Sequence, residues 1–496
     1  MLYLADRFRN LFPHRLGVKN SRRYVPLLIQ CLAAVALFWL VTSGTGRFPH
    51  HGFFLSKVYD SVARSLLDLK TDVDPHEIKN EAFVVNGRVH TYFGIFPALL
   101  RVIPNALFPA YYGQWNRISC FLASLLCLLS FHALVRVRLD ENPRLTAGQK
   151  THLQSLLGLG FALGTPIVFI LSSSFVYHEA IIWGLAGSTS AIFFFFKLLS
   201  RWSASSELLF SCSVAVALLS RASFGLALLP AHVALYLWQR RTYAVRRELP
   251  KFWTISPLVL GLLLQCWVNH DRFGNIATFV DLRYNQTAFP ADQASQRIRN
   301  YEKYGIFNAR RIPTNLAHYF GVQYADYSDS FPFIRMTMPE VPVGDLYEHR
   351  EPTLPLTVST PWLLLFGATG LTLSLRKGML EPPVVLLLVC LLGQGALILM
   401  FHSISERYVA EVLPFLATAG VTGLPWLYRP GPRTCWVSRV FDLLLPAFIS
   451  ASIYISFTSA LAWIGEYLRP YPGWAVPGSF SRSVGHFLEA VNDLLR

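Results

Sequence analysis

The stretch PPVVLLLVCLLGQGALILMFH, residues 382–402, contains no Asp, Glu, Lys or Arg and is long enough to cross a bilayer as a helix. About 20 apolar residues span the hydrocarbon core, which is about 30 Å thick. The whole chain has this character, because 53% of its 496 residues are hydrophobic and only 15% are charged. The composition predicts an all-α polytopic membrane protein and excludes disordered chains and small disulfide scaffolds.

Ten further apolar runs bring the expected number of transmembrane helices to about eleven. Eight are continuous: Val25–Gly44, Arg117–Val137, Leu153–Phe175, Glu179–Leu199, Phe252–His270, Thr357–Leu375, Tyr408–Tyr428 and Val437–Trp463. Two shorter runs lie between Leu208 and Trp238, and Ser220-Arg221-Ala222-Ser223 separates them. Because an arginine in the middle of a bilayer is costly, we expect a hairpin of two short helices with Arg221 at its tip.

The positions of the basic residues predict the orientation of the chain. Half of the 44 lysine and arginine residues lie in the N-terminal segment or in the loops after even-numbered spans. Cytoplasmic loops are enriched in basic residues, so we expect the N-terminus inside and the C-terminus outside. Membrane orientation then explains much of the +15 net charge, and no nucleic-acid partner is expected.

The expected domain organisation follows from these spans: a cytoplasmic segment at 1–24, spans one to seven within 25–270 with an outer loop at 45–116, an outer loop or cap at 271–356, spans eight to eleven within 357–465, and an outer C-terminal tail at 466–496.

The first outer loop has two amphipathic segments. Residues 53–69 place Phe54, Val58 and Val62 on one helical stripe, which predicts a helix lying in the membrane interface. Residues 86–104 begin with the turn signal Asn86-Gly87 and predict a second interfacial helix. The acidic residues between them form either a solvated loop or a divalent-cation site: Asp72, Asp74 and Glu77.

Several local phrases, together with this architecture, resemble the GT-C glycosyltransferases, in an uncharacterised bacterial branch. The phrases are GRVHTYFGIFPALLR at 87–101, VYHEAIIWG at 176–184, LLSRASFG at 218–225, NHDRFGN at 269–275 and SERYVAEVLPFL at 405–416. The resemblance implies a transferase that takes a sugar from a polyprenyl phosphate, such as undecaprenyl phosphate, at the outer face of the inner membrane. Some members carry a Lys-Pro-Pro element where this chain has Phe93-Gly94-Ile95-Phe96-Pro97, so their second acidic residue has no counterpart here.

Sugar transfer to a hydroxyl needs a carboxylate that takes the acceptor proton and cations that stabilise the departing phosphate. Asp60 is the first candidate for the base and Glu81 the second, while pairing of Asp60 with Arg64 is the structural alternative. The candidates for binding the phosphate are Arg221, Arg88, His90 and Arg407. Further residues expected to line the site are Tyr59, Tyr92, His178, Glu179 and Tyr408.

These candidates have structural alternatives. Arg221 could be a membrane-surface anchor, Arg407 could pair with its neighbour Glu406, and His178 with Glu179 could cap a helix. No Walker, HExxH or paired-cysteine motif occurs.

The expected function is therefore an inverting hexosyl- or pentosyltransferase of envelope polysaccharide biosynthesis, acting on a glycan or lipid acceptor. Its expected partners are membrane lipid, the lipid-linked sugar and that acceptor. No cofactor is certain, and the need for a divalent cation stays open. The alternative from another class is a transporter or flippase for a lipid or lipid-linked sugar, which should carry ionisable residues deep within its spans. A scaffold protein of envelope assembly is a third reading.

Overall fold

The computed structural model describes residues 55–243, 252–285, 291–342, 345–376, 380–428 and 432–464, together with residues 28, 31–32, 34–36, 486 and 489–494. Within these ranges seven helices are long and apolar enough to cross a membrane: Asn116–Asp140, Ala147–Ser173, Val176–Ser200, Phe252–Phe273, Pro382–Met400, Glu406–Trp426 and Arg439–Ala462. Shorter apolar helices occur at Phe96–Leu107, Ala204–Ser220 and Pro361–Leu375. The chain is an α-helical membrane protein, as expected. The count of about eleven spans stays a prediction, because most of Val25–Gly44 lies outside the described residues.

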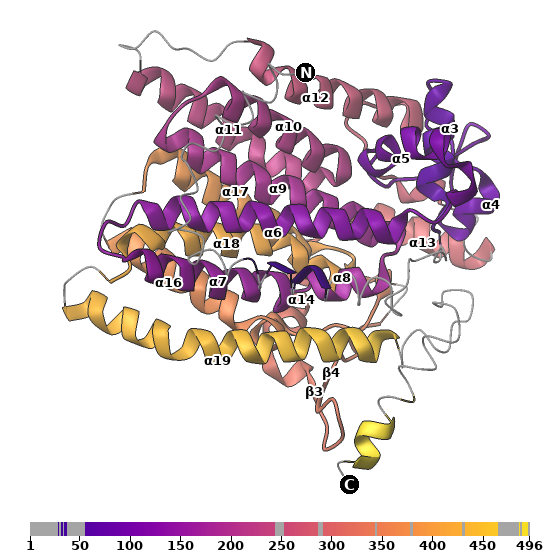
Figure 1. Cartoon of the computed structure of the whole chain (residues 1–496). Helices are drawn as coiled ribbons and strands as arrows, with labels where there is room; N and C mark the ends of the chain where they lie inside the picture. Colours follow the sequence, from indigo (N-terminus) through magenta and orange to yellow (C-terminus); the bar gives the residue numbers. More distant parts are fainter. Residues whose placement is uncertain are drawn as a thin grey trace.

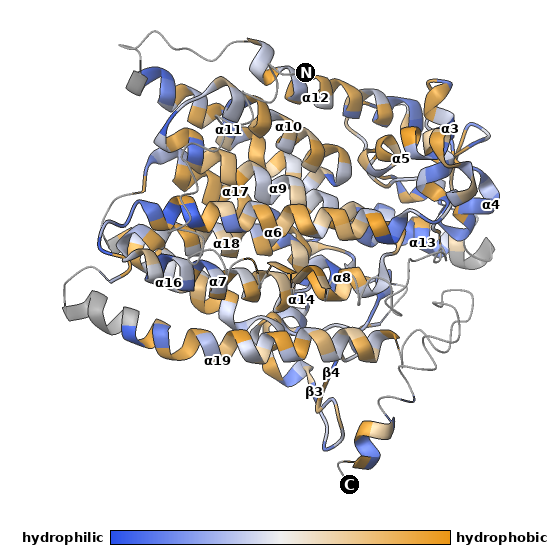
Figure 2. Ribbon diagram, viewed as in Figure 1, coloured by the Kyte–Doolittle hydropathy of each residue, from blue (hydrophilic) through white to orange (hydrophobic). Residues whose placement is uncertain are grey.

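The helical bundle is built around α9. Its helices are α6 (Asn116–Asp140), α7 (Ala147–Leu163), α8 (Ile167–Ser173), α9 (Val176–Ser200), α10 (Ala204–Ser220), α11 (Ala222–Tyr243), α12 (Phe252–Phe273), α16 (Pro361–Arg376), α17 (Pro382–Met400), α18 (Leu413–Gly423) and α19 (Pro432–Ala462). Helix α9 packs against α6, α8, α10 and α11 in the middle of the molecule (Figure 1). Hydrophobic residues cover the middle of the helices, and hydrophilic residues gather toward their ends (Figure 2).

The run expected as one span at Leu153–Phe175 is broken into α7 and α8. Gly164, Thr165 and Pro166 separate the two helices. Proline has no amide hydrogen and disfavours the helical conformation of the residue before it, so the break falls at this point. The two pieces together still form one 27-residue apolar segment.

Helices α10 and α11 form the expected hairpin, with Arg221 between them. The backbone of Arg221 is extended, with φ −154° and ψ 111°. Glu207 in α10 and His232 in α11 both lie more than two turns from Arg221, yet their side chains are 2.7 Å apart. The two helices therefore run antiparallel and side by side.

The segment predicted as the first outer loop folds into a small unit at one end of the bundle. Its elements are α3 (Val58–Leu67), α4 (Pro75–Ile78), η2 (Lys79–Glu81), β1 (Phe83–Val85), β2 (Arg88–His90), α5 (Phe96–Leu107) and η3 (Pro109–Tyr111). The strands form an antiparallel hairpin in which Val85 pairs with Arg88. Asn86 and Gly87 have φ of 51° and 78°, the positive values that a two-residue hairpin turn needs. The turn signal in the sequence therefore marks a β-hairpin, and the second helix begins only at Phe96.

The segment predicted as the second outer loop, 271–356, also contains short elements. They are η5 (Leu282–Tyr284), α13 (Ala291–Tyr304), η6 (Ala309–Arg311), α14 (Ile312–Phe320), η7 (Val322–Tyr324), β3 (Asp326–Tyr327), β4 (Ile334–Arg335), β5 (His349–Arg350) and α15 (Leu356–Ser359). Strand β5 pairs in parallel with β6 (Ser403–Ile404), just before η8 (Glu406–Glu411), while η9 (Leu424–Trp426) follows α18. Figure 1 shows α13 at the same end of the molecule as α3, α4 and α5.

The first outer loop docks on the tip of the α10–α11 hairpin through Gly94. A Cβ atom on Gly94 would lie 2.0 Å from the carbonyl oxygen of Ser220, so only a glycine permits this approach. Arg272, near the end of α12, donates a hydrogen bond of 2.8 Å to the carbonyl oxygen of Phe93. These contacts hold the segment between β2 and α5 against residues next to Arg221.

We predict that Gly94→Ala destabilises the protein by about 1–3 kcal/mol, because a methyl group would overlap the Ser220 carbonyl. The matched control is Gly148→Ala at the start of α7, where nothing lies within 4 Å of the added Cβ. Thermal unfolding in detergent measures both effects. A Gly94→Ala protein as stable as Gly148→Ala would contradict the close approach.

Candidate active site

Arg221, at the hairpin tip, is held by the carboxylate of Glu411. Its Nε donates to Glu411, which lies 190 residues further along the chain and also accepts hydrogen bonds from Ser223 and Gln394 at 2.9 Å. Glu411 is buried, whereas 28% of the Arg221 side chain is exposed. Within the described part of the chain, the two terminal nitrogens of Arg221 make no hydrogen bond. They are therefore free to bind an anion.

Arg407 lies close to two tyrosine rings and is bound to a different carboxylate. Its guanidinium carbon lies 4.7 Å from the ring centroid of Tyr177 and 5.0 Å from that of Tyr408. Its Nη1 donates to both oxygens of Glu351, at 2.6 and 2.5 Å. The ion pair of Arg407 with Glu406, raised as an alternative from the sequence, is not formed: the carboxylate of Glu406 accepts from the backbone N–H of Leu354 at 2.8 Å.

Tyr408 connects the two arginines. The guanidinium carbon of Arg221 is 5.5 Å from the Tyr408 ring centroid, so both arginines lie near the same ring. Such cation–π contacts are stronger where water is excluded, and Tyr408 is only 8% exposed. The phenol ring fixes the spacing of two positive charges that come from different parts of the chain.

Glu81 and Tyr92 reach the same place from the first outer loop. Burial raises the pKa of the Tyr92 hydroxyl well above its ordinary value, the negative charge of Glu81 adds to this, and Arg407 and Arg221 act against it. Glu81 also interacts with the hydroxyl of Tyr177. The Glu81 side chain is neither fully buried nor fully exposed.

We refer to these residues as the arginine–tyrosine cluster: Glu81, Tyr92, Tyr177, Arg221, Arg407 and Tyr408. The cluster joins η2, the segment after β2, the start of α9, the hairpin tip and η8. It combines one carboxylate, two guanidinium groups and three phenol rings, which are groups that can take a proton, bind a phosphate and stack on a sugar ring.

Asp60 belongs to a separate, buried group. Asp60 in α3, Arg101 in α5 and Glu179 in α9 are each less than 5% exposed. Arg101 donates to Glu179, and its Nε is 4.0 Å from Asp60. Among the described residues, neither carboxylate oxygen of Asp60 has a hydrogen-bond partner. Burial raises the pKa of Asp60, although Arg101 acts in the opposite direction.

The side chains of two further expected residues, Tyr59 and His178, form hydrogen bonds with backbone atoms near the start of α9. The hydroxyl of Tyr59, next to Asp60, donates to the carbonyl oxygen of Val176 at 3.3 Å. The Nδ1 atom of His178 accepts from the backbone N–H of Phe175 at 3.2 Å, so His178 caps the start of α9. Asp60 does not pair with Arg64, which lies over the ring of Tyr112 at 4.8 Å.

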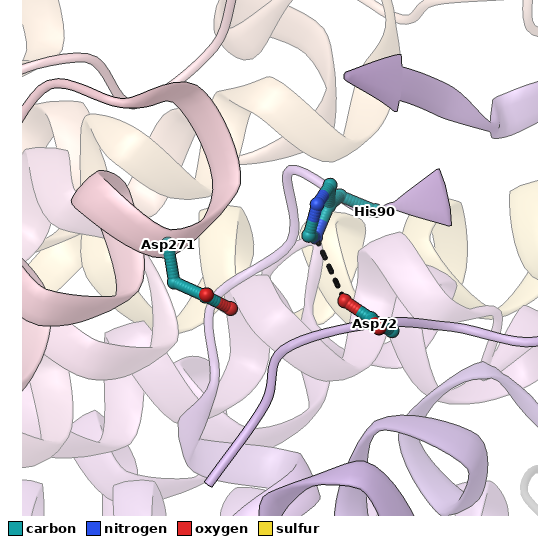
Figure 3. Close-up of side chains that lie close together, drawn as sticks. All are labelled: Asp72, His90 and Asp271. Atoms are coloured by element: carbon teal, nitrogen blue, oxygen red, sulfur yellow. Dashed lines mark ion pairs between the residues drawn. The ribbon is translucent and has the colours of Figure 1, made fainter. Parts of the chain in front are cut away.

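His90 lies in a third group with Asp72 and Asp271 (Figure 3), and Arg88 pairs with both of these carboxylates. Arg88 donates to Asp72 at 2.8 Å and to Asp271 at 3.0 and 3.1 Å. Thr71 also donates to Asp271, at 2.7 Å from its hydroxyl. Burial lowers the pKa of His90, although Asp72 beside it acts against this change.

This third group has residue types that suit a divalent cation. One ligand atom each from Asp72, His90 and Asp271 lies within 4.8 Å of the others. However, the guanidinium of Arg88 already binds both carboxylates, so a metal ion would have to displace it. The geometry is that of ion pairs from Arg88 in β2 to Asp72 and to Asp271 near the end of α12, and it fits a metal centre less well.

The structure thus distributes the residues chosen from the sequence over three groups. Glu81, Arg221, Arg407, Tyr92 and Tyr408 come together, Asp60 with Tyr59 and Glu179 forms the buried group, and Arg88 with His90 joins Asp72 and Asp271. Residues that the sequence did not single out hold these groups in place: Arg101, Tyr177, Asp271, Glu351 and Glu411. Four of these five residues lie within the phrases quoted from the sequence, which are the available signal: Arg101 in 87–101, Tyr177 in 176–184, Asp271 in 269–275 and Glu411 in 405–416.

We predict that Asp60→Asn increases stability relative to the wild type as pH rises. Burial raises the folded-state pKa of Asp60 above its unfolded value, so the protonated carboxyl group contributes fully to the free energy of unfolding only at pH values below the unfolded pKa. That contribution is lost as pH rises through the folded pKa, and asparagine has no such proton. Thermal unfolding of both proteins from pH 4 to pH 8 checks this, and a stability difference independent of pH would contradict it.

We predict that chelation of divalent cations with EDTA leaves the thermal stability of the wild type unchanged, because Arg88 occupies the space between Asp72 and Asp271. In Arg88→Ala the two carboxylates lose their cation, so added Mn²⁺ should raise the unfolding temperature of this variant. A similar increase in the wild type would show that a metal ion displaces the arginine.

Comparison with known proteins gives matches at the level of structure alone. No known protein family and no curated protein matches the sequence. The chain is similar to the Archaeoglobus fulgidus oligosaccharyltransferase in its apo form, with a TM-score of 0.47, 12% identity and coverage of 94% of this chain. It is also similar to ArnT from Cupriavidus metallidurans bound to undecaprenyl phosphate, with a TM-score of 0.48, 11% identity and coverage of 93% of this chain and 77% of ArnT. The chain spans 60% of the length of the archaeal enzyme.

Proposed function

We propose that the chain is an inverting glycosyltransferase that moves a sugar from a polyprenyl phosphate to an acceptor hydroxyl of an envelope glycan or lipid. The observation that carries this proposal is the arginine–tyrosine cluster, in which Glu81, Arg221 and Arg407 meet from three distant segments. A carboxylate beside two guanidinium groups meets the needs of a reaction that removes a proton and releases a phosphate.

Glu81 is the proposed base. It is partly exposed and lies next to Tyr177 and Tyr92, whereas the oxygens of Asp60 are buried and burial favours their protonated form. A carboxylate with no access to solvent is also out of reach of an acceptor hydroxyl. We therefore assign the base role to Glu81 and a structural role to Asp60.

Arg221 is the proposed phosphate ligand. Its Nε is bound to Glu411, which fixes the side chain, while its terminal nitrogens point two donors at an incoming oxygen anion. Arg88 is less suited, because Asp72 and Asp271 already accept from all of its side-chain nitrogens. Arg407 adds a second positive charge beside Tyr408.

The proposed reaction is a single displacement. The acceptor oxygen attacks the anomeric carbon of the sugar as its proton passes to Glu81, and the bond from that carbon to the phosphate oxygen breaks. The electron pair leaves with polyprenyl phosphate, whose new negative charge is stabilised by Arg221. Attack opposite the leaving group inverts the anomeric centre. The reaction is proposed to take place at the outer face, with the N-terminus cytoplasmic.

A second candidate, transport of a lipid or lipid-linked sugar, is favoured by one observation. Glu207 and His232 form a pair of ionisable groups buried between α10 and α11, away from the hairpin tip. Ionisable residues inside membrane helices often mark transport paths. If the protein is a transporter, Glu207→Gln should abolish its function. If it is a glycosyltransferase, Glu207→Gln should lower activity only as far as it lowers the stability of the protein.

We predict that Glu81→Gln and Arg221→Ala each lower glycosyl transfer by about 10²-fold or more, since one loses the base and the other a phosphate ligand. Mass spectrometry of envelope glycans and lipids, from cells with and without the gene, identifies the transferred sugar. The two variants are then tested by complementation of the deletion strain.

The control is Glu77→Gln in α4, because Glu77 pairs with Lys57 at 3.6 Å and lies in the same loop as Glu81. This variant should restore the wild-type glycan. The enzymatic proposal fails if deleting the gene changes no glycan or lipid. The assignment of Glu81 as the base fails if the Glu81→Gln protein fully restores the wild-type glycan in the deletion strain.

A further inference from the structure

The long external loop contributes a carboxylate to the arginine–tyrosine cluster. Glu351 follows β5, and its side chain accepts two hydrogen bonds from Arg407 and one from the hydroxyl of Ser405. The side chains of Glu351 and Arg407 are 15% and 8% exposed. Both bonds from Arg407 come from Nη1, so the carboxylate fixes the position of this end of the guanidinium group.

Backbone pairing sets the register of this contact. Strand β5 pairs with β6 so that Arg350 lies opposite Ile404. The backbone N–H of Glu351 then donates to the carbonyl oxygen of Ile404 at 2.8 Å, three residues before Arg407. The carboxylate is therefore placed by the sheet and not by the length of its own side chain alone.

Glu351 also gives Arg407 a carboxylate partner other than Glu81. Arg407 and Glu81 both interact with Tyr177, and both act on the Tyr92 hydroxyl. If Arg407 lost Glu351, its guanidinium would have Glu81 as a nearby carboxylate, and an arginine bound to a carboxylate makes it a weaker base.

We infer that Glu351 is a positioning residue, which holds the guanidinium of Arg407 over the rings of Tyr177 and Tyr408 and so makes the external loop 271–356 part of the active site. This inference rests on the proposed function. Glu351 touches neither the donor nor the acceptor in this scheme, and it acts through Arg407.

The inference is tested on the purified full-length protein in detergent, with undecaprenyl phosphate as the probe. Glu351→Gln should bind this lipid about tenfold more weakly than the wild type, and so should Arg407→Ala. The double variant should bind no more weakly than Arg407→Ala alone, because both changes remove the same contact. Glu351→Asp, which keeps the charge, should recover part of the affinity.

Glu348→Gln is the matched control. Glu348 lies just before β5, pairs with Arg297 and with His402 at 3.2 Å, and is 20% exposed, close to the value for Glu351. The Glu348→Gln protein should bind undecaprenyl phosphate with an affinity within about twofold of that of the wild type. Thermal unfolding confirms that each variant is folded.

The outcomes separate the two proposals. If the wild type binds undecaprenyl phosphate and Arg221→Ala weakens binding while Glu351→Gln does not, the positioning role is wrong and the proposed function stands. Additive losses in the double variant would also overturn the positioning role. If the wild type does not bind this lipid, the proposed donor is wrong and the inference falls with it. If Glu351→Gln does not fold, the affinity of Glu351→Asp decides, and a value no tighter than that of Arg407→Ala overturns the inference.

Discussion

A charged group that leaves water needs a partner, and ion pairs formed for this reason attach the loops of the protein to its bundle. Arg101 in the first loop binds Glu179 at the start of α9, 78 residues away. Arg88 binds Asp271 across 183 residues, and Arg407 binds Glu351 across 56. The Arg101 and Arg407 pairs are buried, and removing one partner from such a pair costs about 3–5 kcal/mol, because the other charge is then left uncompensated. The pairs therefore specify one arrangement of the loops.

The same constraint separates charges that hold the fold from charges that are available for chemistry. Each donor nitrogen of Arg88 is used by a carboxylate, and Asp60 lies beneath α5 with no access to solvent. Arg221 differs because its carboxylate takes one nitrogen and leaves the other two free. A cationic group that is fixed at one end and open at the other suits the binding of an anion.

Much of the fold could be predicted from the sequence, because the information is local. Apolar runs locate the helices, Asn86-Gly87 locates the turn, and Arg221 between two short runs locates the hairpin tip. The environment of Asp60 could not be predicted in this way. The pattern predicts its helix, but the burial of its carboxylate depends on α5, which packs on α3, and on the start of α9, which Tyr59 and Arg101 contact. Glu351 and Glu411 were missed for the same reason, since their partners are 56 and 190 residues away.

The one-residue break between α10 and α11 has a geometric consequence. As a continuous helix, 17 and 22 residues with Arg221 between them would extend about 60 Å, twice the hydrocarbon thickness of a membrane. The extended backbone of Arg221 turns the chain back, so one residue both shapes the hairpin and carries its charge. An inserted residue would have to draw Arg221 away from Glu411 or slide one helix along the other. The length of this turn is therefore constrained by the packing of both helices as well as by the ion pair at its tip.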